Sequence, residues 1–165
     1  MSKRKTGLQK AIELAVKVHS GGDRTGYPYI THPLRVMEKL TGNSEKIVAI
    51  LHDIVEDTPT TLEDLDQMGF AQNVVEAVKA MTHLDEDSYM DYVIKIKSNS
   101  IARKVKLADL EDNFNLPRTL MRPARLEGDL DRLRRYALSW RFLQDKITEE
   151  EYRQAMNVTI SAKNN

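Results

Sequence analysis

The chain has 165 residues, 41% of them hydrophobic and 30% charged, with 25 basic residues balanced by 25 acidic ones. Balanced charge provides no basic surface for nucleic acid and no bulk attraction to a membrane. Because the chain has no cysteine, disulfides, thiolate metal ligands and a cysteine nucleophile are excluded.

The length and composition are typical of one helical domain, which we place over residues 1–165. Its core should cover roughly residues 7–143, with a C-terminal helix over 148–160 and a frayed tail over 161–165. No apolar segment follows the basic N-terminus, and no apolar run approaches membrane-spanning length. We therefore expect a cytoplasmic protein with neither nucleic acid nor membrane as a partner.

The first predicted helix covers residues 7–19, where apolar residues recur at helical spacing before Gly22. Thr31 should cap a second helix, with Pro33 in its first turn, where a missing N–H costs nothing. Gly42 marks the end of this second helix.

A third helix is predicted from Ser44 to about Asp57, and Pro59 prevents its continuation. The later predicted helices are a short one from Thr60 or Thr61 to Gly69, then about 71–82, about 88–97, one from Ser100 that carries Asp109 and Asn113, 129–143, and a last one that begins with the capping box Thr148–Glu151. No strand pattern of useful length and no internal repeat is evident. The predicted fold class is all-α, a single bundle of about eight to ten helices.

The most informative stretch is an apolar run, residues 47–51, that leads directly into His52 and Asp53. Glu56 and Asp57 follow within one helical turn, on the same face as Asp53 if the helix is continuous. Burying a carboxylate without a partner is costly, so such groups are usually paired or bound to a metal. The stretch therefore predicts half of a metal site.

His32, at a predicted helix start, and Asp109, within an otherwise apolar helix, are the natural additional ligands. With His52 and Asp53 they provide two nitrogen and two oxygen ligands, and positions remain for water and substrate. A histidine and carboxylate set without thiolates suits Mn²⁺, Fe²⁺ or Zn²⁺, and Mn²⁺ fits it well. Such an ion can polarise a phosphoryl oxygen and generate hydroxide near neutral pH.

Glu56 and Asp57 then have a role, because they could orient or deprotonate the attacking water. Each candidate also has a purely structural interpretation. Asp109 could be a core acid with a polar partner, His32 could be bonded locally at a helix start, and a lone His-Asp dipeptide is common by chance. We favour the metal site, since several candidate ligands recur on separate helices, and we expect the other two histidines to be structural or on the surface.

The order and spacing of these motifs resemble the hydrolase domain of RelA/SpoT-type enzymes, which are HD-domain metal-dependent phosphohydrolases, and the small alarmone hydrolases. The matching segments are Pro28-Tyr-Ile-Thr-His-Pro33, Leu51-His-Asp-Ile-Val-Glu-Asp57 with Thr60-Thr-Leu-Glu-Asp-Leu65, and Val105-Lys-Leu-Ala-Asp109 with Asn113. The resemblance covers roughly residues 8–143, and it implies an HD helical bundle without a synthetase domain.

The resemblance implies hydrolysis of the 3′-pyrophosphate of ppGpp or pppGpp, the guanosine alarmones of the stringent response. Mn²⁺ is the family's cofactor, and other divalent transition metals are compatible with it. Carried over by position, the metal ligands would be His32, His52, Asp53 and Asp109, and the residues that activate water would be Glu56 and Asp57. The substrate-binding residues would be Arg24 and Thr25 in a guanine-contacting loop, Asn113 near the nucleoside, and Tyr136 on the substrate side.

Two features depart from the family pattern. The loop between His19 and His32 is slightly shorter, and Glu111 and Asp112 follow the Asp109 motif where the family has a basic or histidine residue. These two acids would lie close to a bound polyphosphate. The alternatives are an HD phosphohydrolase for a deoxynucleotide, an NADPH-like dinucleotide phosphate or a sugar phosphate, and a non-catalytic module that binds nucleotide or protein. The sequence leaves the oligomeric state open.

Overall fold

The computed structural model describes residues 5–23, 25–84, 86–115 and 122–158. This part of the chain forms helices and no strand, apart from an isolated backbone bridge between Gly22 and Pro28. The predicted all-α fold is confirmed. No helix in the described ranges combines the length and the apolar character that a bilayer crossing requires.

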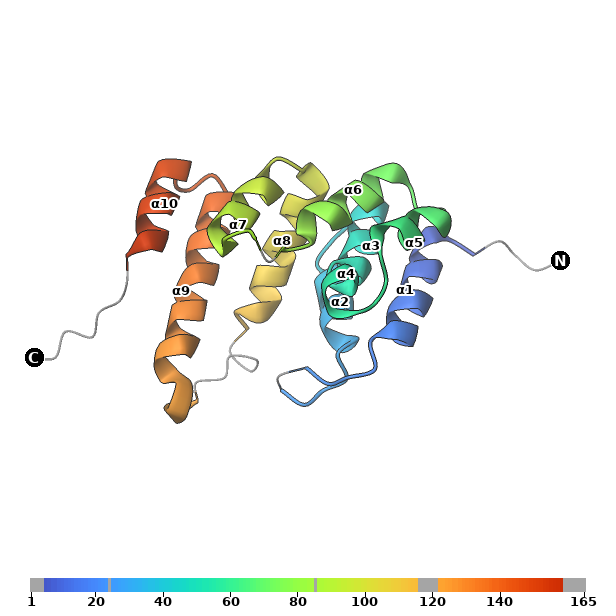
Figure 1. Cartoon of the computed structure of the whole chain (residues 1–165), viewed down its shortest axis with the longest axis horizontal. Coiled ribbons are helices and arrows are strands. Elements are labelled where there is room, and N and C mark those ends of the chain that lie inside the picture. Colours follow the sequence, from blue (N-terminus) through green and yellow to red (C-terminus); the bar gives the residue numbers. More distant parts are fainter. Residues whose placement is uncertain (1–4, 24, 85, 116–121, 159–165) are drawn as a thin grey trace, which may run out of the picture.

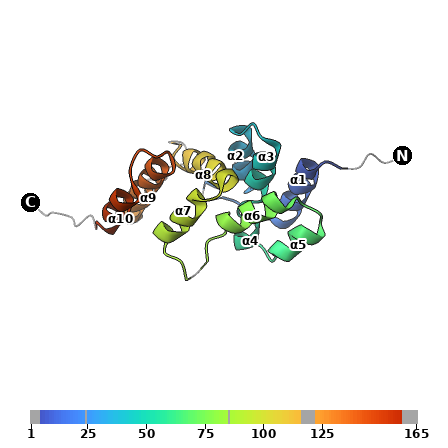
Figure 2. The same cartoon turned by 90° about the horizontal axis from the view of Figure 1, so that it is seen from above.

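The helices follow one another as α1 (Gly7–Val18), α2 (Thr31–Glu38), α3 (Asn43–Leu51), α4 (Ile54–Asp57), α5 (Leu62–Gln67), α6 (Gln72–Met81), α7 (Tyr89–Lys97), α8 (Ser100–Asn113), the 3-10 helix η2 (Pro123–Arg125), α9 (Leu126–Leu143) and α10 (Glu149–Asn157). Figure 1 shows α1 to α6 gathered at one end of the molecule and α9 with α10 at the other. Helix α8 lies between these two groups in both views (Figures 1 and 2).

Local capping explains where several helices begin. The predicted capping boxes are present at Thr61 with Asp64 and at Thr148 with Glu151, and each satisfies otherwise unpaired backbone N–H groups. A threonine cap of this kind contributes about 0.5–2 kcal/mol. The predicted cap at Thr31 is wrong, because α2 begins at that residue and its hydroxyl donates to the Pro28 carbonyl at 2.8 Å.

The predicted continuous helix over 44–57 is also wrong, because α3 ends at Leu51 and α4 begins at Ile54. The reason is a side-chain hydrogen bond: Nδ1 of His52 lies 2.8 Å from the Ala49 carbonyl oxygen. In a continuous α-helix that carbonyl would accept from the backbone N–H of Asp53. The imidazole therefore takes the place of one backbone hydrogen bond, and the chain turns at the His-Asp pair.

Helix α9 begins at Leu126, three residues earlier than predicted. Asp129 is buried within its first turn and accepts from the backbone N–H of Arg122 at 3.0 Å and from its guanidinium at 2.7 Å. These bonds join η2 to α9, which extends the helical segment toward its N-terminus.

The core is centred on α3, in which residues 47–51 are all buried. Ile50 and Leu51 are 1% and 0% exposed, and burying each stabilises the fold by about 1.5–3 kcal/mol. Because α3 packs against α1, α2, α6 and α8, its C-terminal end is buried inside the bundle. The His-Asp pair leaves this end directly, so the packing of α3 determines where both side chains lie.

Candidate metal centre

Three of the four predicted ligands converge from separate helices. His32 on α2, His52 after α3 and Asp109 on α8 each offer one ligand atom, and these atoms lie within 4.8 Å of one another. All three residues are buried. The fourth, Asp53, lies beside this group, with Oδ2 3.1 Å from Nε2 of His52 and 3.9 Å from Nε2 of His32.

His52 presents a nitrogen with no hydrogen-bond partner. Its Nδ1 must donate to Ala49, because a carbonyl oxygen only accepts, so in the neutral ring Nε2 has a free lone pair. Nε2 is buried and has no hydrogen-bond partner among the described residues, although Asp53 is nearby. A lone pair directed at carboxylate oxygens is unfavourable unless a proton or a cation lies between them.

His32 has the same arrangement with a different partner. Its Nδ1 lies 2.7 Å from Oδ2 of Asp112, which is bonded in turn by Arg35, and its Nε2 lies 3.3 Å from Oδ1 of Asp109. Asp112 is 1% exposed, and its carboxylate is hydrogen-bonded to His32 and Arg35, both on α2. The side chain of Asp112 thus packs against α2 and does not line the described cavity wall, and its proximity to a bound polyphosphate stays a prediction.

Two residues without an assigned role support the carboxylates. The hydroxyl of Tyr29 donates to Oδ2 of Asp53, and Nζ of Lys106 lies 2.9 Å from Oδ2 of Asp109. Asn113 also donates to Asp109, at Oδ1. Sequence analysis assigned no role to Tyr29 or Lys106. Both residues lie within segments that match the RelA/SpoT-type hydrolase domain, and this position was the signal that could have identified them as site residues.

The ionisable groups shift one another's pKa values strongly. Burial alone would lower the pKa of His52, but the carboxylates of Asp53 and Asp109 raise it to about 9. Burial raises the pKa of Asp53, and the adjacent His52 imidazolium outweighs it and brings the value to about 2. Against the effect of burial, Lys106 and both histidines also lower the pKa of Asp109. The cluster thus favours two carboxylate anions with positive charge between them.

These properties fit a divalent cation. Two imidazole nitrogens and two carboxylate oxygens form the donor set, which suits first-row divalent metals. The unpaired Nε2 of His52 is oriented toward the other donors, and the Nδ1 bond of each histidine leaves its Nε2 available. A bound cation would relieve the same electrostatic imbalance that raises the pKa of His52 when no metal is present.

An open cavity of about 370 Å³ adjoins the ligands. Its wall is formed by Gly22, Asp23, Tyr29, His32, Asp53, Tyr89, Lys106, Asp109, Asn113 and Tyr136. Two predicted substrate residues, Asn113 and Tyr136, therefore lie beside the centre. The hydroxyl and backbone N–H of Thr25 instead donate to Asp23 at 2.5 and 2.8 Å, and Thr25 does not belong to the described wall. Arg24 lies outside the described residues.

The predicted water-activating residues lie on α4, next to the centre. Oε1 of Glu56 accepts from the backbone N–H of His83 at 2.5 Å, and burial raises the pKa of this carboxyl above its usual value. Burial and the Asp53 carboxylate raise the pKa of the Tyr29 phenol most, and the nearby Asp57 carboxylate raises it further. Neither acid forms part of the described cavity wall.

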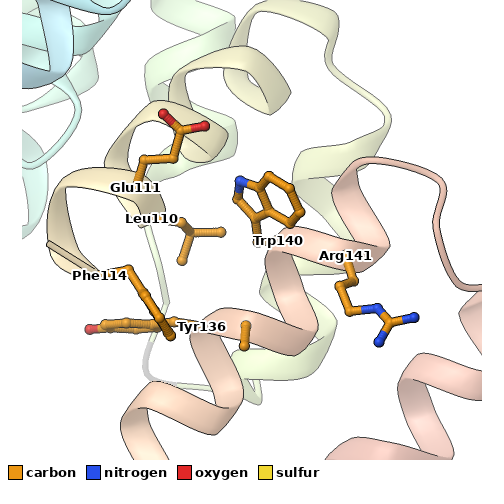
Figure 3. Close-up of a pocket in the computed structure, with 7 residues that line it drawn as sticks. Leu110, Glu111, Phe114, Tyr136, Trp140 and Arg141 are labelled. Atoms are coloured by element: carbon orange, nitrogen blue, oxygen red, sulfur yellow. The ribbon is translucent and has the colours of Figure 1, made fainter.

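A second cavity, also of about 370 Å³, lies between α8 and α9. Figure 3 shows its wall, which consists of Leu110, Glu111, Phe114, Tyr136, Ala137, Trp140 and Arg141. The guanidinium of Arg141 points away from Phe114 and Tyr136 in this view. Tyr136 lines both cavities, whereas the predicted metal ligands His32, Asp53 and Asp109 line only the first.

No family model matches the chain. The bifunctional (p)ppGpp synthase/hydrolase SpoT of Escherichia coli K12 is 37% identical over 89 residues, which are 51% of this chain and 12% of SpoT. The guanosine-3′,5′-bis(diphosphate) 3′-pyrophosphohydrolase of Aquifex aeolicus is 33% identical over 144 residues, which are 84% of this chain and 18% of that protein. The chain thus spans less than a fifth of either relative.

A solved structure, described as a metazoan orthologue of SpoT that hydrolyses ppGpp, has the same fold. It superimposes with a TM-score of 0.62 at 20% sequence identity and covers 96% of this chain and 100% of its own. At this identity the likeness establishes the shared fold alone.

Proposed function

We propose that this chain, which is related in sequence to the SpoT-type (p)ppGpp hydrolases and shares the fold of a metazoan SpoT orthologue, is a metal-dependent pyrophosphohydrolase of guanosine tetra- and pentaphosphate. One observation supports the metal-dependent chemistry most strongly. The buried, unpaired Nε2 of His52 faces His32 and Asp109 beside an open cavity. Such a buried nitrogen is unfavourable in a purely structural site.

The residues that would hold the ion are His32, His52, Asp53 and Asp109. We propose Mn²⁺, because this ion accepts both imidazole and carboxylate ligands and completes its shell with water. When bound, such an ion polarises a phosphoryl oxygen and lowers the pKa of water. Around it, Tyr29 and Lys106 hold the two carboxylates in place by donating to the Oδ2 atom of each.

In the proposed reaction, water adds to the phosphorus bound to the 3′ oxygen, the bond between that phosphorus and the 3′ oxygen breaks, and pyrophosphate leaves. The 3′ oxygen takes up a proton and becomes a hydroxyl. We assign removal of the water's proton to Glu56 and orientation of the water to Asp57. The raised pKa of Glu56 supports its role, because a stronger base accepts a proton more readily near neutral pH.

Asn113 and Tyr136 would contact the nucleotide, since both line the cavity beside the proposed ligands. Lys106, which lines the same wall, adds a positive charge next to the site where phosphates would lie. We place the reaction in the cytoplasm, where guanine nucleotides are made and used.

A second candidate is hydrolysis of another nucleotide by the same metal centre. The Thr25 hydroxyl donates to Asp23 in a local turn, so its proton is not available to a base. The chemistry at the phosphate would be unchanged, and only recognition of the nucleoside would differ.

A substrate panel separates the two candidates. Purified chain with Mn²⁺ is incubated with ppGpp, a deoxynucleoside monophosphate, NADPH and a sugar phosphate, and the products are resolved by ion-exchange chromatography. We expect GDP and pyrophosphate from ppGpp. Turnover of another compound with ppGpp untouched would support the second candidate. Metal binding without any turnover would contradict both and favour a binding module.

A further inference from the structure

Asp112 is a buried carboxylate that the proposed reaction does not use. It lies on α8, three residues after Asp109, and its side chain is bonded to two residues of α2. Oδ2 lies 2.7 Å from Nδ1 of His32, and Oδ1 accepts from Nε of Arg35 at 2.8 Å. The second guanidinium contact, from a terminal nitrogen of Arg35 to Oδ2, is 3.3 Å long.

This geometry determines the orientation of the His32 ring. A carboxylate accepts only, so Nδ1 of His32 holds the proton and donates it to Asp112. Nε2 is then left to face Oδ1 of Asp109 at 3.3 Å. Without Asp112, the imidazole could rotate or exchange tautomers, and its lone pair would no longer be held toward the other donors.

Arg35 keeps Asp112 in the required state. The guanidinium lies 2.8 Å from Oδ1 of Asp112, and this ion pair favours the ionised carboxylate, which accepts from His32. The Arg35 guanidinium donates to both carboxylate oxygens of Asp112, which prevents the Asp112 side chain from turning away from His32. A buried acid with a histidine and an arginine as partners is also compatible with a purely structural tie between α2 and α8.

We propose that Asp112, clamped by Arg35, is a positioning residue for His32 and thereby sets the affinity of the centre for its divalent ion. The inference rests on the metal site of the proposed function. His52 has no equivalent side-chain partner, because its Nδ1 is bonded to the backbone carbonyl of Ala49. His32 is therefore the histidine of the pair whose orientation depends on a replaceable side chain.

The test uses Mn²⁺ alone, without nucleotide, and the purified full chain. Isothermal titration gives the Kd for Mn²⁺, and thermal unfolding with and without Mn²⁺ gives the rise in Tm that the ion causes. The variants are Asp112→Asn and Arg35→Met. Glu111→Gln is the matched control, because Glu111 is the neighbouring acid on α8 and its side chain is 48% exposed.

We expect Asp112→Asn to raise the Kd by about 10- to 100-fold, the range found when a partner of a metal-bound histidine is removed. Arg35→Met should raise it by less, and Glu111→Gln should leave it unchanged. In a His32→Ala background, Asp112→Asn should cause no further loss of affinity. A structural tie would not produce this last result, because the two losses would then add.

A lowered metal-free Tm with an unchanged Kd in Asp112→Asn would overturn the inference. If that variant fails to fold, an unchanged Kd in Arg35→Met has the same consequence. Failure of the proposed function is recognised separately, since a wild-type chain that binds Mn²⁺ but hydrolyses no nucleotide would contradict the activity and leave the Asp112 result intact.

Discussion

His52 donates from Nδ1 to the carbonyl oxygen of Ala49 at 2.8 Å, and this bond both ends α3 and leaves Nε2 toward the centre. One side chain thus interrupts the helix and presents a ligand atom. The bond also makes Nε2 a buried atom without a hydrogen-bond partner among the described residues. The structural cost of this arrangement leads to the first prediction.

Replacing His52 by Leu should abolish metal binding without lowering the stability of the metal-free chain at a pH where the His52 ring is neutral. Above its pKa of about 9 the His52 ring is neutral and its unsatisfied Nε2 costs about 1–3 kcal/mol, so in that pH range the metal-free variant should have a free energy of unfolding equal to or above that of the wild type. Mn²⁺ should no longer raise its Tm, because a ligand is lost. Urea unfolding in EDTA and thermal unfolding with Mn²⁺ measure the two effects. Retention of the full metal-induced Tm rise would remove His52 from the ligand set.

Lys106→Met should destabilise the chain more strongly without metal than with it. Lys106 is buried and pairs with Asp109 at 2.9 Å, and removing one partner of such a pair costs about 3–5 kcal/mol. Mn²⁺ would compensate part of the charge left on Asp109, so the loss should shrink when the ion is present. Urea unfolding with EDTA and with Mn²⁺ measures both values.

The control for this substitution is Lys5→Met, since the Lys5 side chain is 59% exposed and pairs with Glu13, whose side chain is 56% exposed. An exposed pair contributes about 0–1 kcal/mol, so this variant should resemble the wild type in both conditions. Equal losses for Lys106→Met with and without Mn²⁺ would contradict a metal bound at Asp109.

The pH dependence of hydrolysis should report Glu56. Its carboxyl accepts the proton of water only when ionised, and burial raises its pKa. The value of kcat/KM should therefore fall as the pH falls through this raised pKa and stay level above it. Glu56→Gln should reduce kcat by about 10²- to 10⁴-fold and abolish this acid limb. The exposed acid Glu63 supplies the control substitution Glu63→Gln, and an unchanged profile in Glu56→Gln would exclude Glu56 as the base.

Tyr136→Phe should weaken nucleotide binding and leave metal binding intact. Tyr136 lines the cavity beside the centre, and the loss of one hydrogen bond to substrate corresponds to about 0.5–1.5 kcal/mol, or roughly 2- to 10-fold in KM. Steady-state kinetics and the Mn²⁺ Kd measure the two quantities. Trp140 lines the second cavity of Figure 3 and not the first, so Trp140→Phe should change neither quantity. Equal effects of both substitutions would indicate a packing role for Tyr136.

The helical class and most helix positions were predictable from the sequence, because capping residues and apolar spacing act locally. Thr61 and Thr148 show this most directly, since each bonds to groups within three residues. The resemblance to SpoT-type hydrolases is also confirmed, and it depended on motif order along the chain. The domain limits and the roles of individual site residues remain predictions.

The sequence-based predictions of structure fail where a side chain forms a hydrogen bond that helical spacing and capping patterns do not specify. The break after Leu51 depends on the rotamer of His52, which helical spacing does not specify. The sequence placed Asp112 close to a polyphosphate because it occupies a position where the family has a basic or histidine residue, and it did not reveal that the packing of α8 on α2 turns this side chain toward Arg35. Only the tertiary arrangement of α2 and α8 could reveal that contact.

The most direct test of the central claim is release of pyrophosphate from ppGpp, measured by ³¹P NMR with the purified chain in Mn²⁺, after EDTA treatment, and after Mn²⁺ is restored. We predict pyrophosphate and GDP with Mn²⁺, none with EDTA, and recovery on restoration. Asp109→Asn, which should weaken the proposed metal site, should release none in any condition. Release of pyrophosphate by Asp109→Asn at the wild-type rate, or by the wild type in EDTA, would contradict a metal-dependent reaction at this centre.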